Sequence, residues 1–280
     1  MAGETILITG ATSGIGQATA RALAPRVGRL LVHGPQPVDH VTPVVDDLRA
    51  RLGYGGSLEY FQADYGRFAD VVRLADDVVT AADRVDVIIN NAARPGAPTW
   101  TVTADGNELT LQVNYLAPVV LTSLLLERLA DQGHARIVNV ASATHLSATL
   151  DLDDLDLRHG YAPVAAYARA KLALVAYTCW LADHVPHAEI ETVAVHPGVI
   201  ATGLLHAMFA GGGGDPERAA RALVDVAGRS GDSGTYYDER RPAEPNPAAR
   251  DRRFQQRLLD LTAARLSPLG VRVGRGSRGR

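Results

Sequence analysis

Short apolar runs rich in β-branched residues alternate with longer segments of helical periodicity along most of the chain. The apolar runs predict strands at 5–10, 29–34, 58–64, 85–92, 136–142 and 190–198, with a seventh at 234–238. The segments between them predict helices at 14–24, 38–52, 67–82, 103–132 and 163–184. Because helices between strands act as crossover connections, the alternation predicts an α/β fold, a doubly wound parallel sheet with helices on both faces. Ligands of such sheets bind beyond the carboxyl ends of the strands, so chemistry is expected just after each strand.

Composition and charge exclude some classes of function but do not identify one. The 280 residues are close to the limit for one hydrophobic core, and the 46% hydrophobic and 21% charged residues are ordinary for a globular protein. A net charge of −3 gives no general attraction to nucleic acid or anionic membranes. The longest apolar stretch, LAPVVLTSLLL, is short for a membrane span, so we expect none. The single cysteine, Cys179, fits a reducing, cytoplasmic location.

The first predicted strand leads into a glycine-rich turn, TGATSGIG, from Thr9 to Gly16. Glycine at positions 10, 14 and 16 lets the backbone turn tightly and approach a pyrophosphate, which the following helix N-terminus can bind through its N–H groups. A tight strand–helix turn without a ligand would use the same glycines. The place of this turn after the first strand of a βαβ unit favours a dinucleotide site.

Two further strand ends carry side chains or small residues suited to a ligand. Asp64 follows the third strand and can accept a hydrogen bond from an adenine amino group, although a helix cap would use the same residue. The fourth strand ends in NNAA, Asn90 to Ala93, where small residues suit a ligand that lies close to the backbone. A plain asparagine turn is the alternative.

The fifth and sixth strands end in residues that can contact a carbonyl or a carboxamide. Ser142 can donate a hydrogen bond to a substrate carbonyl, or can simply cap a turn. In HPGVIATG, Pro197 and Gly198 turn the chain and Thr202 offers a hydroxyl to a carboxamide, or the segment is only a turn.

The only lysine of the chain, Lys171, lies four residues after Tyr167. Positions i and i+4 share a helix face, so the two side chains are expected to meet. A nearby ammonium favours phenolate, and we therefore expect it to draw the pKa of Tyr167 toward neutrality. Tyr161 lacks this spacing. An incidental pair on a solvated helix face is the alternative interpretation.

Asn114 lies in the long helical segment, four residues before Pro118. Proline clashes with the carbonyl four residues back, so the Asn114 carbonyl is expected to be free to bind a water beside the lysine. An ordinary helix asparagine is the alternative.

Together these residues resemble the short-chain dehydrogenase/reductase superfamily in its single-domain Rossmann form, over nearly all of residues 4–265. The resemblance implies that the TGxxxGxG turn cradles pyrophosphate and that an Asn-Ser-Tyr-Lys tetrad performs the chemistry. The tetrad positions here are Asn114, Ser142, Tyr167 and Lys171. The cofactor positions carried over are Gly10, Thr12, Ser13, Gly14, Ile15, Gly16, Asp64, Tyr65, Asn90, Asn91, Ala92, Tyr167, Lys171, Pro197, Gly198, Val199, Ile200 and Thr202. No metal site is implied.

Longer stretches resemble the retinol dehydrogenase-like branch of that superfamily. TADGNELTLQVNYLAPVVLTSLLLERL, RIVNVAS and VAVHPGVIATGL follow its pattern, as does the acidic LDLDDLDLRHGY before the tyrosine. The membrane anchor of the vertebrate members is not seen. Pro35 stands where relatives that prefer NADP usually have arginine, and no acidic residue is present there to favour NAD. Arg21 and Ser13 are candidates for a 2′-phosphate, and the balance slightly favours NADP(H) over NAD(H).

The chain is therefore predicted to hold one catalytic domain, residues 1–265, with a substrate loop at 143–166 and a flap at 203–215. A basic Gly/Arg tail at 266–280 is expected to be flexible. The predicted function is NAD(P)(H)-dependent transfer of hydride between nicotinamide and a ketone, aldehyde or alcohol, with Tyr167 as general acid and base. An epimerase or dehydratase without net redox change, or a dinucleotide-binding regulatory protein, remains open. The family resemblance implies a homodimer or homotetramer, although its retinol dehydrogenase-like branch includes monomers.

Overall fold

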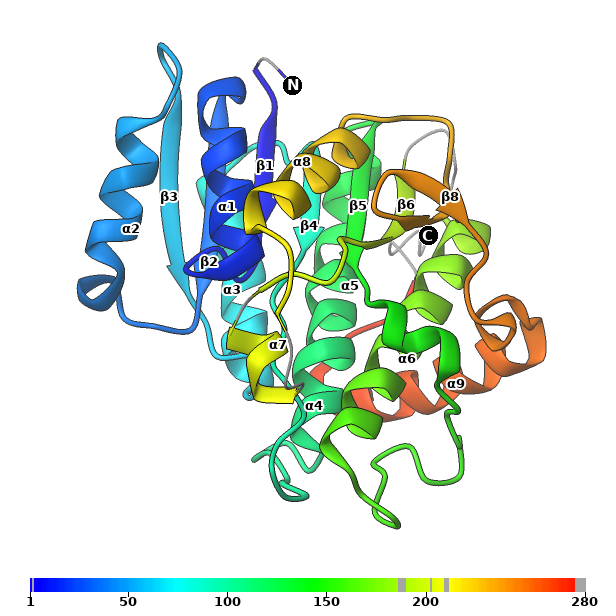
Figure 1. Ribbon diagram of the computed structural model, residues 1–280. Helices are drawn as coiled ribbons and strands as arrows, with labels where there is room; N and C mark the ends of the chain where they lie inside the picture. Colours follow the sequence, from blue (N-terminus) through cyan, green and yellow to red (C-terminus); the bar gives the residue numbers. More distant parts are fainter. Residues whose placement is uncertain (2, 186–189, 202, 209–211, 275–280) are drawn as a thin grey trace.

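The computed structural model describes residues 1, 3–185, 190–201, 203–208 and 212–274. One sheet of eight strands, in the order β3-β2-β1-β4-β5-β6-β7-β8, runs through the molecule (Figure 1). Strands β1 to β7 are parallel and β8 pairs antiparallel with β7. The strands are β1 Thr5–Ile8, β2 Arg29–Gly34, β3 Ser57–Gln62, β4 Val87–Asn90, β5 Ala135–Val140, β6 Ile190–His196, β7 Tyr236–Asp238 and β8 Arg241–Ala243.

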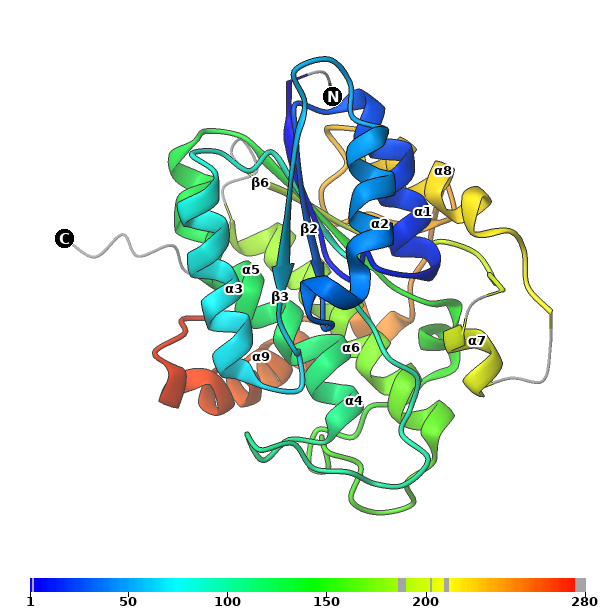
Figure 2. The same ribbon diagram turned by 90° about the vertical axis from the view of Figure 1, so that its left-hand side faces the viewer.

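Helices cover both faces of the sheet (Figure 2). One face carries α1 (Gly14–Leu23), α2 (Val38–Ala50) and α8 (Pro216–Ala227), and the other carries α3 (Phe68–Ala81), α5 (Ala117–Asp131), α6 (Pro163–His184) and α9 (Arg252–Leu266). Short helices α4 (Leu109–Leu111) and α7 (Gly203–Met208) lie near the carboxyl ends of the strands. The prediction of a doubly wound parallel sheet is confirmed, and β8 adds one strand to the predicted seven.

The predicted helix 103–132 is wrong at its start. Val102 and Glu108 pair in an isolated antiparallel bridge, and helix begins only at Leu109 because the Glu108 carboxylate accepts from the N–H groups of Thr110 and Leu111. A π-helical segment, Gln112–Leu116, then leads into α5. It ends just before Pro118, whose missing N–H and bulky ring disturb the regular hydrogen-bond ladder as expected.

The continuous helical run Leu109–Asp131 is long and apolar enough to cross a membrane by length and composition alone, which the sequence prediction did not anticipate. Of its most apolar window, 89% is buried inside the protein. Its side chains pack with those of α3 and α6 against the sheet, so its apolar character is that of a core helix.

The described part of the predicted tail is packed rather than free. Ser267–Leu269 form a 3₁₀ turn after α9, and Val271 is buried. Gly274 lies so close to Trp180 of α6 that a Cβ there would come within 2.2 Å of the indole ring. Apolar residues of this segment pack in the same cluster as side chains of α6. The predicted flexibility is therefore wrong for the described part of the tail, because the prediction considered only its glycines and arginines.

Candidate active site

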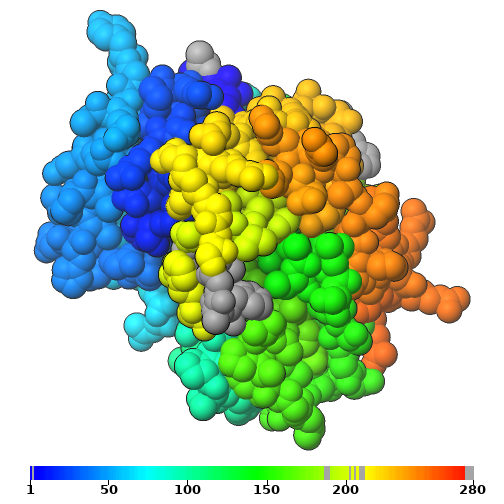
Figure 3. Space-filling view, in the orientation of Figure 1, coloured from blue at the N-terminus to red at the C-terminus, as the bar shows by residue number. Residues whose placement is uncertain are grey.

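A cavity of about 840 Å³ opens at the carboxyl edge of the sheet. Its walls come from the turn after β1, the ends of β2 to β6, the N-terminal half of α6 and the start of α7. In the space-filling view, α7 and the segment leading to α8 (yellow) lie across this side, between the blue N-terminal part and the green segment before α6 (Figure 3). The cavity therefore lies where a doubly wound sheet is expected to bind a ligand.

The glycine-rich turn is shaped for close approach of a ligand. Gly10 has φ +67° and a Cβ there would lie 2.7 Å from the Cα atom of Ala92. A Cβ on Gly16 would lie 2.0 Å from the carbonyl oxygen of Gly10. Ser13, at the N-cap of α1, makes no side-chain cap hydrogen bond, so its hydroxyl and the helix N–H groups face the cavity edge. This cradle fits the pyrophosphate of a dinucleotide.

His33, at the end of β2, was missed by sequence reasoning. Its Nδ1 atom accepts from the Gly10 N–H over 3.3 Å and its Nε2–H donates to the Ala63 carbonyl over 2.9 Å, while its ring stacks on Tyr65. Burial lowers the pKa of His33 to about 4, which keeps the ring neutral and this tautomer in place. Only its place at a strand end could have indicated a role.

Asp64 lines the cavity from the segment after β3. Its Oδ1 atom accepts from the Gly66 N–H over 2.8 Å. The N-cap of α3 is Arg67, so the helix-cap interpretation of Asp64 is wrong. The carboxylate is exposed, and the expected contact with an adenine amino group stays a prediction.

The region after β2 holds neutral polar groups. Gln36 lines the cavity, and its Oε1 atom accepts from the Thr12 hydroxyl over 3.0 Å. The Tyr60 hydroxyl donates to the Gln36 carbonyl over 2.6 Å, which holds this residue against the turn. Arg21, a candidate for a 2′-phosphate, is instead paired with Asp47 at 2.7 Å and is not among the residues of the cavity wall.

The two asparagines after β4 have different places. Asn90 is buried away from the cavity and donates to Thr122 and Asn139, so the structure does not support its predicted contact with a cofactor. Asn91 lines the cavity and donates to the carbonyl oxygens of Thr9 and Gly10. Neighbouring residues of an extended strand point to opposite sides, which explains why one asparagine joins the core and the other the site.

Asn114 does not line the cavity either, but it shapes one wall. It is fully buried, and its amide accepts from the Arg94 N–H and donates to the Arg94 carbonyl, both over 2.9 Å. Arg94 and Pro95 belong to the cavity wall. Asn114 therefore holds the loop after β4 in place, and its expected water-binding carbonyl stays a prediction.

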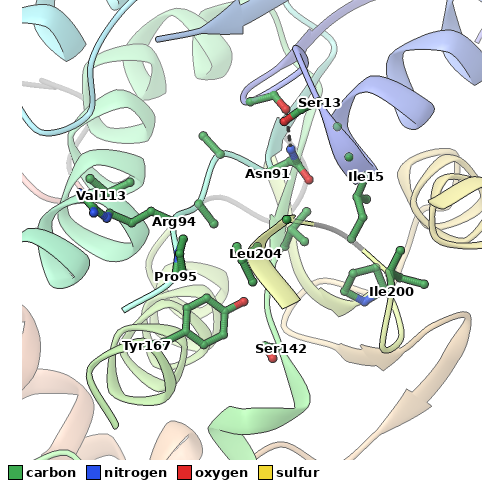
Figure 4. A pocket seen from close by; sticks show the side chains of 18 of the residues that line it. Ser13, Ile15, Asn91, Arg94, Pro95, Val113, Ser142, Tyr167, Ile200 and Leu204 are labelled. Carbon is green, nitrogen blue, oxygen red and sulfur yellow. Dashed lines mark hydrogen bonds between the residues drawn. The ribbon is translucent and has the colours of Figure 1, made fainter. Parts of the chain in front are cut away.

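Ser142 follows β5 and caps a turn, whereas its predicted hydrogen bond to a substrate carbonyl stays a prediction. Its hydroxyl caps the 3₁₀ turn Ala143–Ser147, where it accepts from the N–H of Thr144, and it also lies in the cavity wall. Figure 4 shows Ser142 and Tyr167 together at one end of the cavity, with Ser13 at the other end. Ser142 after β5 and Tyr167 on α6 therefore reach the same end of the cavity from two elements that the predicted substrate loop connects.

Tyr167 and Lys171 lie in the same wall, on one face of α6. The Lys171 Nζ atom is 5.8 Å from the centre of the tyrosine ring and donates to the Val140 carbonyl over 2.7 Å. Burial raises the pKa of Tyr167 to about 12, although a hydrogen bond with Ser142 opposes the rise, and burial lowers the pKa of Lys171 to about 7. The predicted lowering of the Tyr167 pKa is therefore wrong. Burial removes hydration from the phenolate of Tyr167 and from the ammonium of Lys171, and so disfavours the charged form of each residue.

The segment after β6 lines the cavity, and its predicted contact with a carboxamide stays a prediction. Pro197, Gly198, Val199 and Ile200 line it, and Ile200 forms an isolated bridge with Gly214. Thr202 lies outside the described residues. Of the predicted site residues, the cavity wall brings together Gly10, Thr12, Ser13, Gly14, Ile15, Gly16, Asp64, Tyr65, Asn91, Ala92, Ser142, Tyr167, Lys171, Pro197, Gly198, Val199 and Ile200.

The family pattern described as short chain dehydrogenase matches residues 4–211. The chain belongs to the short-chain dehydrogenase/reductase superfamily. Within it the chain falls in the retinol dehydrogenase-like branch, as the resemblance implied. It is 31% identical over 297 residues to retinol dehydrogenase 13 of Mus musculus, covering 99% of this chain and 87% of that protein.

Other relatives of this short-chain dehydrogenase/reductase have different named substrates. Polyprenol dehydrogenase of Mus musculus is 36% identical over 287 residues, covering 94% of this chain and 84% of that protein. A candidate daunorubicin C-13 ketoreductase of Streptomyces sp. strain C5 is 32% identical over 275 residues, covering 94% and 92%. A solved structure of an uncharacterised protein from Mycobacterium paratuberculosis has 28% identity and a TM-score of 0.78, covering 95% and 94%. The chain is thus related to dehydrogenases and reductases throughout its length.

Among the described residues, no group of three or more His, Cys, Asp or Glu side chains is placed to hold a metal ion. The charged side chains of the cavity wall are Asp64, Arg94 and Lys171. The candidate chemistry therefore rests on hydroxyl, ammonium and backbone groups.

Proposed function

We propose that this protein is an NAD(P)(H)-dependent oxidoreductase that interconverts a carbonyl compound and the corresponding alcohol. The observation that carries the proposal is the meeting of Ser142, Tyr167 and Lys171 in one cavity wall that continues into the glycine cradle. A bound nicotinamide dinucleotide supplies or accepts the hydride. The cradle and the tetrad-like groups lie at two ends of one cavity, which suits a long ligand with its reactive end beside Tyr167.

In the direction of reduction, the Tyr167 phenol gives its proton to the substrate oxygen as the carbon–oxygen double bond becomes single. Ser142 donates a hydrogen bond to the same oxygen and orients it. Lys171, with its pKa near 7, can hold a proton at neutral pH beside the phenol and can donate to ribose hydroxyls. Its positive charge stabilises the phenolate that remains after proton transfer. Oxidation of an alcohol uses the same groups in reverse.

NADP(H) is the proposed cofactor, with a slight preference over NAD(H). The hydroxyl of Ser13 and the amide of Gln36 line the cavity and can donate to a 2′-phosphate. Both groups are neutral, so the preference is expected to be small.

The substrate is proposed to be an apolar alcohol or carbonyl compound. Relatives named for retinol, polyprenol and a daunorubicin ketone support this class. A cytoplasmic location is also proposed, because the only cysteine is half-buried and burial raises its pKa to about 11, so it is an inert packing residue that needs no oxidising compartment.

The test is a panel of retinal, decanal, 4-nitrobenzaldehyde and menadione with NADPH and NADH, followed by nicotinamide absorbance, and the matching alcohols with the oxidised cofactors. Tyr167→Phe is expected to lose at least about 100-fold in turnover with unchanged cofactor affinity. Tyr161→Phe is the matched control, because the Tyr161 hydroxyl donates to the Ala97 carbonyl outside the cavity wall. Full turnover in Tyr167→Phe would refute the mechanism. Product formation without net change in nicotinamide would favour an epimerase or dehydratase instead.

A further inference from the structure

The Ser142 hydroxyl has both of its acceptor positions engaged by one neighbour. The Thr144 N–H donates to the Ser142 Oγ atom over 3.3 Å, and the Thr144 hydroxyl donates to the same atom over 3.1 Å. A hydroxyl oxygen accepts two hydrogen bonds and donates one. With both acceptor positions used, the Ser142 hydroxyl is left to act as a donor, at the end of the cavity where Tyr167 also lies.

The backbone of Ser142 is held from the other side by His145. The His145 Nδ1–H donates to the Ser142 carbonyl over 2.6 Å, and its Nε2 atom accepts from the Asn246 N–H over 3.3 Å. The ring is fully buried and meets the Tyr236 ring edge-on, with 4.8 Å between centroids. These contacts fix the ring in one tautomer and the serine carbonyl in one direction.

Asn246 brings a distant part of the chain to this turn. Its Nδ2 atom lies 3.0 to 3.1 Å from three carbonyl oxygens of the turn after Ser142, those of His145, Leu146 and Ala148. Its Oδ1 atom accepts from the Ala248 N–H and so caps the next 3₁₀ turn. Asn246 lies 101 residues beyond His145 in sequence, on the segment after β8. The two segments are thereby joined at a buried contact.

We propose that Thr144, His145 and Asn246 are positioning residues that orient the Ser142 hydroxyl as a hydrogen-bond donor to the substrate oxygen. This inference rests on the proposed function. Thr144 sets the direction of the hydroxyl proton, His145 holds the serine carbonyl, and Asn246 prevents the turn from rotating away. A donor that is oriented before the reaction stabilises developing charge on the substrate oxygen without the cost of reorganisation.

Thr144 provides the first test, with the most active carbonyl compound of the panel as probe and saturating NADPH. Thr144→Val keeps the shape and the backbone N–H but removes the hydroxyl donor. It is expected to lower kcat about tenfold, with unchanged cofactor Kd and nearly unchanged KM, and to raise the solvent deuterium isotope effect. Thr144→Ser restores a hydroxyl and is expected to recover most of the rate. Equal rates in the valine and wild-type proteins would overturn the role of Thr144.

Asn246→Ala tests the distant contact against a matched control, Asp251→Ala. Both variants remove an N-cap, since Asn246 caps the turn Pro247–Arg250 and Asp251 accepts from the Phe254 N–H at the start of α9. In the described part of the chain, the Asp251 side chain makes no hydrogen bond with the turn after Ser142. Both are expected to lower Tm by about 2–4 °C. Only Asn246→Ala is expected to lower kcat, about tenfold, and to raise the isotope effect.

A double variant shows whether the two residues act on the same group. Thr144→Val combined with Asn246→Ala is expected to lose much less than the product of the separate losses. Multiplicative losses, or an equal loss of kcat in Asp251→Ala, would overturn the inference and leave only a structural role. If the wild type turns over and Tyr167→Phe does not, such a result refutes the positioning alone. If Tyr167→Phe keeps full turnover, the proposed function fails first.

Discussion

The Nζ atom of Lys171 donates to the Val140 carbonyl over 2.7 Å, although the lysine side chain is only 2% exposed. Val140 ends β5, two residues before Ser142. The only lysine of the chain therefore ties α6 to the strand that carries the serine, in a place where its charge is poorly hydrated. Burial lowers the pKa of Lys171 toward neutrality, which suits proton transfer. The same burial destabilises the fold, because the ammonium loses its hydration.

Lys171→Met is expected to abolish turnover and to stabilise the fold at pH 7. The pKa of Lys171 is about 7 in the folded protein and near 10.5 when unfolded, so between these values the unfolded chain binds a proton that the folded chain lacks. Wild-type stability should therefore rise with pH from 7 to 10, and the variant should lack this rise. At pH 7 the free energy of unfolding of Lys171→Met is expected to exceed that of the wild type by about 3 kcal/mol. This figure includes a loss of about 1 kcal/mol for the missing hydrogen bond to Val140.

The measurement is urea unfolding at several pH values, with Leu174→Met as the control. Leu174 is also buried in α6 and does not titrate, so that variant should keep the wild-type pH slope with a change below about 1.5 kcal/mol. A lysine variant with the wild-type slope would show that Lys171 is charged in the folded protein.

His33 is expected to make cofactor binding sensitive to acid. The pKa of His33 is about 4 in the folded protein and near 6.5 in the unfolded chain, so between these pH values only the unfolded chain binds the proton. The free energy of unfolding therefore falls by about 3 kcal/mol as the pH drops from 6.5 to 4. Protonation also puts an N–H against the Gly10 N–H and should loosen the phosphate cradle.

His33→Asn separates this effect from general acid sensitivity, because its side-chain oxygen can accept from Gly10 without titrating. Calorimetric NADP⁺ binding should then weaken less between pH 6.5 and 4.5 than in the wild type. His159→Asn, at an exposed histidine, is expected to behave as the wild type. Identical acid profiles for all three proteins would argue against the His33 contact.

Gln36→Arg is expected to increase the preference for NADP(H) about tenfold. The new guanidinium would lie in the cavity wall beside Thr12 and Ser13, where it can pair with a 2′-phosphate. Gln36→Asp is expected to shift the preference toward NAD(H) by a similar factor, through its ribose hydroxyls. The ratio of the two dissociation constants, measured by fluorescence quenching, is the readout. An unchanged ratio in both variants would place the 2′-position elsewhere.

Arg265 of α9 is expected to hold the substrate loop. It pairs with Asp156 at 2.9 Å and donates to Asn107, and both of these partners are buried. Arg265→Met should destabilise the fold by about 1–3 kcal/mol and raise KM for the carbonyl substrate more than cofactor Kd, because Asp156 is left without its partner. Arg257→Met is the control, since Arg257 pairs with Asp153 of the same loop at the exposed surface. That variant should change stability by less than about 0.5 kcal/mol. Equal effects of the two variants would contradict the special role of the buried pair.

The face of α6 is expected to make no subunit contact. Helix α9 and the turn Pro247–Arg250 pack on α6 within the chain, and Gly274 lies against Trp180. A homodimer or homotetramer that paired α6 between subunits would have to displace these segments. Sedimentation should therefore show a particle of about 29.7 kDa. A dimer that dissociates on substitution of an α6 residue would refute this expectation.

The local features of the site could be predicted from sequence because they depend on neighbours along the chain. Period and composition located β1 to β7 and the long helices between β1 and β6, although not α7 or α8, and the four-residue spacing placed Tyr167 and Lys171 on one face. The glycine turn was recognisable because only glycine tolerates its close approaches. Parallel strands then bring their carboxyl ends to one edge, so the cavity was expected where it is found.

Only the tertiary structure decided which neighbours these residues meet. Asn90 and Asn91 have the same chemistry, but the packing around the end of β4 places the first in the core and the second at the cavity. The opposite pKa shifts of Tyr167 and Lys171 come from burial, which depends on packing by distant segments. The contact of Asn246 with His145 joins residues 101 positions apart. Sequence determined the local conformation and the side chains available, whereas desolvation and long-range hydrogen bonds arise only when the sheet and its helices pack together.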